Sequence, residues 1–152
     1  MNGWFPSYLV VATLAGTQIS CQGQVNRDWK IDIGIRNIGT RMIDEASVKW
    51  GEFRFSAGFV APSKEAVHVS FDRPVPETAV VEYSLPDGKQ VKKTVIVKGA
   101  IPAAAYKDRD MTVMFVVNSD TGQVTVEFLH FIQTDEGARL VPYGTTNPVA
   151  TK

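Results

Sequence analysis

The feature that most constrains the fold is an alternation of apolar and polar side chains that begins at residue 29. Four apolar residues carry its first run: Trp29, Ile31, Ile33 and Ile35. Because successive side chains of a β-strand point to opposite faces, this spacing predicts a strand with one buried face and one wet face. Alternation recurs as far as residue 133, and no segment carries a clear helical period. We therefore expect an all-β chain.

Six further strands are expected where the alternation resumes between turn residues. They span residues 48–55, 67–71, 81–85, 91–97, 111–117 and 124–132. Gly51 marks a change of phase, where a bulge or a tight bend would restore the inward direction. Pro86-Asp87-Gly88 is the strongest turn signal and predicts a hairpin. Lys93 shares the phase of the valines around it; because an inward lysine blunts an exposed strand, strand 91–97 is expected at or near a sheet edge.

Strand number and rhythm indicate the architecture. About seven short strands, with a tryptophan in an early one, predict a two-sheet antiparallel sandwich over residues 28–133. The number and spacing of the strands resemble those of immunoglobulin-like and fibronectin type III-like modules. They also resemble those of small exported bacterial proteins of unknown role. Residues 134–152 are interpreted as a flexible C-terminal tail.

The first 26 residues carry no charged side chain and form a separate segment. Their apolar run, residues 4–15, falls short of the roughly 20 residues that a membrane-spanning helix needs, and is typical of a secretory signal. Ile19-Ser20-Cys21 resembles the processing site of bacterial lipoproteins, which implies lipid attachment at Cys21. The alternative is that residues 8–15 form a buried strand and Cys21 is an inert thiol.

Composition and motifs argue against most chemistry. Sixteen basic residues balance sixteen acidic ones, which gives no reason to expect a nucleic-acid partner. His68 is expected on the surface, facing away from the aliphatic row, and His130 at the edge of the core. Three loop aspartates lack the graded spacing of a calcium loop: Asp108, Asp110 and Asp120. With no zinc-type histidine spacing and no phosphate loop or nucleophile elbow, we predict no catalytic, cofactor-binding or metal-binding residues.

The last predicted hairpin is apolar on both faces. Its second apolar face carries four residues: Met114, Val116, Leu129 and Phe131. Such a strand pair is either covered within the chain or exposes a patch. The cover would come from residues 101–109, the C-terminal tail or an N-terminal strand. The alternative is a contact surface for another protein or for self-association with a second copy.

The sequence predicts a non-catalytic, exported β-sandwich module, a structural or protein-binding component of the bacterial cell envelope. It would be periplasmic, extracellular, or anchored to the membrane only through a lipid on Cys21. The first alternative is a carbohydrate-binding module with an aromatic stacking face made of Trp50, Phe53, Phe55 and Tyr83, which requires Trp50 or Tyr83 to be exposed. The second is a small hydrolase or metal-dependent enzyme, which requires His68 or His130 beside a carboxylate in a concave site.

Overall fold

A computed structural model describes residues 30–107, 110–135 and 137–143. The predicted leader, Cys21 included, and residues 144–152 of the predicted tail lie outside these ranges. The statements below concern the described residues.

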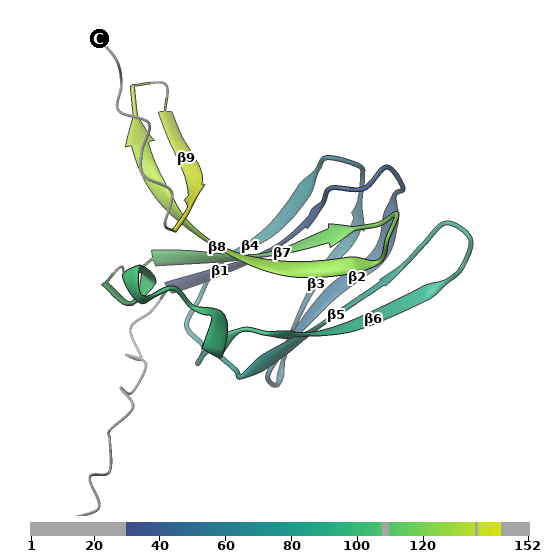
Figure 1. The fold of residues 1–152 in the computed structure, drawn as a ribbon, viewed down its shortest axis with the longest axis horizontal. Helices are drawn as coiled ribbons and strands as arrows, with labels where there is room; N and C mark the ends of the chain where they lie inside the picture. The colour runs from purple at the N-terminus through teal and green to yellow at the C-terminus, as the bar shows by residue number, and fades with distance from the viewer. Residues whose placement is uncertain (1–29, 108–109, 136, 144–152) are drawn as a thin grey trace, which may run out of the picture.

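Nine strands and two short 3₁₀-helices make up the described chain (Figure 1). They are β1 (Lys30–Asn37), β2 (Ile43–Trp50), β3 (Phe53–Val60), β4 (Glu65–Phe71), β5 (Thr78–Ser84), β6 (Gln90–Ile96), η1 (Lys98–Ala100), η2 (Ala103–Lys107), β7 (Asp110–Asn118), β8 (Gln123–Thr134) and β9 (Gly137–Pro142). No helix in the described ranges has the length and apolarity needed to cross a membrane. The all-β prediction is confirmed.

The strands form two sheets. One has the order β4-β1-β7-β8-β9 and the other the order β3-β2-β5-β6. Neighbouring strands run antiparallel except β1 and β7, which run parallel from the Lys30↔Asp110 pair to the Asn37↔Val117 pair. The sequence predicts antiparallel pairing alone, and this prediction is wrong for β1 and β7. These two strands are far apart in the chain, so no hairpin turn forces them to run antiparallel.

One hydrophobic core takes its side chains from both sheets. Ile31, Ile33 and Ile35 of β1 are fully buried, as the alternation predicts. From the other sheet come Trp50 and Tyr83, at 2% and 1% exposure. The rings of Trp50 and Phe115, on β2 and β7, meet edge to face with centroids 6.5 Å apart. The two sheets are therefore held together by the apolar rows that the sequence pattern identifies.

The hairpin predicted at Pro86-Asp87-Gly88 is present between β5 and β6. Gly88 takes a φ of 80°, which a side chain would strain, and its N–H donates to the carbonyl of Leu85 at 2.8 Å. β6 lies at the edge of its sheet, as predicted. Lys93 pairs with the buried Val81, so it lies in the inward phase, yet it stays exposed at that edge.

Two boundaries differ from the predictions. Gly51, with a φ of 59°, lies in a tight turn, and Trp50 pairs with Phe53, so the predicted strand 48–55 is two antiparallel strands. The predicted domain end at residue 133 falls inside β8, and residues 137–142 of the predicted tail form β9. Residues 137–142 become a strand because they pair with β8, from Leu129↔Pro142 to Thr134↔Gly137, and composition alone does not reveal this pairing.

Candidate functional site

His68 faces the core side of β4, which corrects the predicted direction. Ile31 pairs with Phe71 but Ile33 pairs with His68, so β4 has one extra residue between these pairs. This bulge reverses the phase of the residues before it. His68 therefore shares the face of the buried Ile33, while Val67 turns outward and is 37% exposed. The imidazole is exposed, as predicted, and lies 5.7 Å from the rings of both Phe53 and Phe55 on β3.

His130 is half-buried on β8, and its ring lies 4.6 Å from that of Tyr143. Tyr143 packs against the core, and its N–H donates to the carbonyl of Phe128 at 2.9 Å. The two histidines are thus on separate strands, each beside aromatic rings.

The acidic and histidine side chains are spread over the molecule. No group of three that would hold a metal ion occurs within residues 30–107, 110–135 and 137–143. Of the three loop aspartates, Asp108 lies outside these ranges and Asp110 starts β7. Asp120 accepts two hydrogen bonds from Thr40, one from the backbone and one from the hydroxyl, both 2.8 Å long. These bonds lower the pKa of its carboxyl group, the backbone bond contributing most.

The proposed aromatic stacking face is buried. Trp50, Tyr83 and Phe55 are 2%, 1% and 7% exposed. The indole Nε1 of Trp50 donates to the carbonyl of Pro74 at 3.1 Å. Burial also raises the pKa of Tyr83. A sugar ring cannot stack on these four side chains together, because three of them lie inside the protein.

The predicted contact face lies on the outer side of the five-stranded sheet. Met114, Val116 and Leu129 are at most 5% exposed and form a second small cluster, against which Leu140 of β9 packs. Phe131 is 57% exposed. The four residues therefore do not form one exposed patch.

Arg36 provides part of the cover on that face. It lies opposite Val116, and its guanidinium group binds Glu65 of β4 at 2.9 Å and Glu127 of β8 at 3.1 Å. Since β7 lies between β1 and β8, the side chain of Arg36 passes over β7 to reach Glu127. Its aliphatic stem covers apolar surface there, as long charged side chains commonly do.

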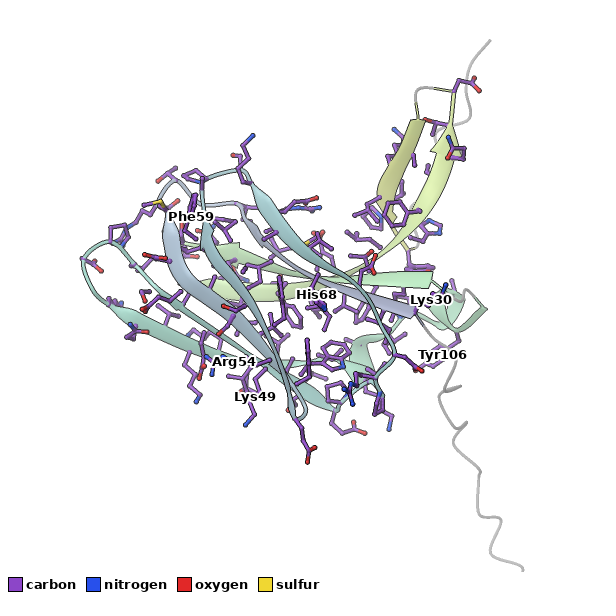
Figure 2. The ribbon with its side chains drawn as sticks, turned by 180° about the vertical axis from the view of Figure 1, so that it is seen from behind. Lys30, Lys49, Arg54, Phe59, His68 and Tyr106 are labelled. Atoms are coloured by element: carbon purple, nitrogen blue, oxygen red, sulfur yellow. The ribbon has the colours of Figure 1, made fainter. Side chains whose placement is uncertain are left out.

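A surface that the sequence analysis did not identify lies at one end of both sheets. Four loops meet there: residues 38–42, 61–64, 85–89 and 119–122, which we call the tip. Figure 2 shows Phe59, near the tip, at the opposite end of the molecule from Lys30 and Tyr106.

Asn37 organises the base of the tip. Its side chain is fully buried, and its Nδ2 donates to the carbonyls of Arg41, at 2.7 Å, and Val60, at 3.2 Å. Its Oδ1 accepts the N–H of Gly39 at 3.0 Å. An asparagine that satisfies three backbone groups at once fixes the path of the first loop.

Further hydrogen bonds tie that loop to two others. Ser119, 1% exposed, donates to the carbonyl of Arg41 at 2.7 Å and accepts its N–H at 3.2 Å. Asp120 accepts the two hydrogen bonds from Thr40 described above. The guanidinium group of Arg41 forms an ion pair with Asp87 of the β5–β6 turn at 2.7 Å. This contact lowers the pKa of Asp87. Three loops thus form one hydrogen-bonded unit.

Apolar side chains are exposed on or beside this unit. Ile38, Met42 and Phe59 are 56%, 44% and 66% exposed. Ile43 pairs with Val60, and both are buried; the exposed Met42 and Phe59 directly precede them in the chain. The sequence signal for the tip lies in residues 37–40, where Asn37 and Gly39 are residues that favour a fixed turn.

The opposite end carries a hollow of about 680 Å³, lined by the β2–β3 turn and the β4–β5 loop. Apolar walls come from Phe53, Pro74 and Val75, and charged groups from Glu52, Arg73 and Glu77. Lys98 binds Glu77 at 2.9 Å, which raises the pKa of the lysine. The hollow thus has a mixed lining in which one charged group is already paired.

No protein-family model matches the chain, and no curated protein matches it. Among solved structures, an NMR structure of a protein from Eubacterium rectale is similar over 68% of this chain and 92% of that one, with 14% identity and a TM-score of 0.45. Function is therefore inferred from the residues of this chain alone.

Proposed function

We propose that this chain is a non-catalytic, exported β-sandwich of the immunoglobulin-like or fibronectin type III-like kind, which binds another protein through its tip. One observation carries the proposal: Ile38, Met42 and Phe59 are exposed beside loops that hydrogen bonds from the buried Asn37 and Ser119 hold in place. A single core shared by both sheets supports the sandwich architecture.

The tip combines the features of a protein-binding surface. Apolar side chains supply the area that a partner buries, while polar groups such as Arg41, Thr40 and Asp120 surround them. Because the polar groups are already bound to one another, little conformational entropy is lost when a partner docks. The partner we propose is a protein with an apolar recess. With no net charge on the chain, short-range packing dominates its recognition.

The location of the tip fits attachment to a cell envelope. Lys30, the first described residue, lies at the opposite end of the molecule (Figure 2). A chain anchored by a lipid on Cys21 would therefore hold its tip away from the membrane. Intact-mass measurement of the protein extracted from membranes tests the anchor: a diacylated chain starting at Cys21 is expected, and an unmodified chain starting at Met1 would exclude it.

Retention of partners from envelope extracts tests the tip. The immobilised protein is compared with a variant carrying Met42→Ser and Phe59→Ser, and with a control carrying Ile96→Ser. Ile96 is 64% exposed, close to the value for Phe59, but lies on β6 outside the tip. We expect a protein that is retained by the wild type and the control and lost by the double variant. Equal retention by all three would reject the tip as the binding surface.

A further inference from the structure

A second surface, independent of the tip, lies where β8 leaves the body of the molecule. β8 pairs with β7 from Gln123 to Leu129 and with β9 from Leu129 to Thr134. Beyond Leu129 it therefore continues as a two-stranded ribbon with β9, which we call the arm (residues 130–135 and 137–142). Figure 1 shows the arm projecting away from the two sheets.

One edge of the arm is open to pairing. On the side of β8 opposite β9, no described strand pairs with Phe131–Thr134. Such an edge presents backbone N–H and C=O groups to any strand that can align with it. A two-stranded ribbon is also marginally stable by itself, so an added strand would stabilise it.

The side chains along this edge offer no protection against pairing. From Phe128 to Thr134 the chain has no charged residue. β6, the edge strand of the other sheet, carries Lys92 and Lys93 instead. On the arm, Phe131 is 57% exposed and pairs with the half-buried Leu140, so its apolar surface is available to a partner.

We propose that this edge joins two copies of the chain. The absence of charge favours a second copy, because two identical uncharged edges meet without repulsion. Two β8 strands align antiparallel about a two-fold axis beside Ile132, so that Ile132 faces its symmetry mate and Phe131 faces Gln133 of the other copy. The product is a continuous four-stranded ribbon with the order β9-β8-β8-β9.

Light scattering on the full chain across a concentration series tests the dimer. The wild type is expected to reach twice the chain mass. Phe131→Lys is expected to remain at the monomer mass, since it puts one lysine from each copy at diagonal positions of the joined edge, where they repel each other. Phe59→Lys is the matched control: a phenylalanine of similar exposure at the tip, whose change should leave the dimer intact. Circular dichroism confirms that each variant is folded.

Oxidative cross-linking tests the same contact without adding a charge. Ile132→Cys, in a chain that also carries Cys21→Ser, should form a disulfide dimer, because facing residues of paired strands lie about 4.5–5.5 Å apart at Cα, within disulfide reach. Thr125→Cys, an exposed position on the part of β8 that pairs with β7, should not. A wild type that stays monomeric throughout, or a dimer lost in Phe59→Lys but kept in Phe131→Lys, would overturn the proposal.

Discussion

Arg36 and Glu127 lie on strands that do not pair with each other, yet their side chains form an ion pair of 3.1 Å across the intervening β7. A second bond from Arg36, to Glu65 at 2.9 Å, extends the contact to the sheet edge. Beneath it lie Met114 and Val116, both buried. The polar bridge and the buried residues below it cover most of the face for which the sequence left two alternatives, cover within the chain or an exposed patch.

Arg36 should stabilise the fold mainly through its stem. Its ion pairs are about one third exposed, so their loss in Arg36→Met should cost about 1 kcal/mol or less. Arg36→Ala should cost more, about 1–2 kcal/mol, because the aliphatic cover over Val116 is also lost. Urea unfolding measures both. Equal losses would show that charge, and not packing, is what Arg36 contributes.

Trp50 should be among the most sensitive positions in the core. It is 2% exposed, contacts Phe115 and donates to Pro74, so Trp50→Ala should destabilise the fold by about 3–5 kcal/mol. His68→Ala should cost about 1 kcal/mol or less, because this side chain is exposed and packs at the side of the core, beside Phe53 and Phe55. Similar losses for the two variants in denaturant titration would contradict the assigned faces.

Gly39 should tolerate no side chain. A Cβ there would lie 2.2 Å from Oγ of Ser119 and 2.5 Å from its backbone nitrogen. Gly39→Ala should therefore break the Ser119–Arg41 hydrogen bonds and cost about 1–3 kcal/mol in thermal unfolding. At Gly99 a Cβ would meet only Ile96, at an ordinary 3.5 Å, so Gly99→Ala is the control and should be nearly neutral. A harmless Gly39→Ala would mean that the first loop is not fixed by Ser119.

The carboxylate of Asp120 should stabilise the tip only when ionised. Its folded-state pKa lies below the ordinary 3.8, so its contribution is present above that pH and is lost as pH falls through the folded-state pKa. Wild type should therefore be more stable than Asp120→Asn at neutral pH, and the difference should vanish in acid. Thermal unfolding from pH 7 to pH 2 measures the difference. Glu52→Gln, at the other end of the molecule, controls for general charge effects; a difference that stays constant with pH would exclude an ionic role for Asp120.

Most strands and much of the core could be predicted from local sequence patterns. Alternation is a local consequence of the pleated backbone, so Ile31, Ile33 and Ile35 could be assigned to the buried face without knowing their partners. The β5–β6 hairpin could be predicted for the same reason, since Pro86-Asp87-Gly88 sets its own turn conformation. No such local signal marks β9, whose strand character depends on pairing with β8.

Which strands are neighbours, and which side chains cover each face of a sheet, became known from the tertiary structure. Pairing β1 with β7 put Arg36 within reach of a glutamate 91 residues away, and the tip depends on contacts between Thr40 and Asp120, 80 residues apart. The direction of His68 followed from one extra residue in β4, which shifts its register against β1. Which distant segments pair depends on the free energy of both segments together. The pattern of one segment describes only one of the two partners, so it cannot identify the other.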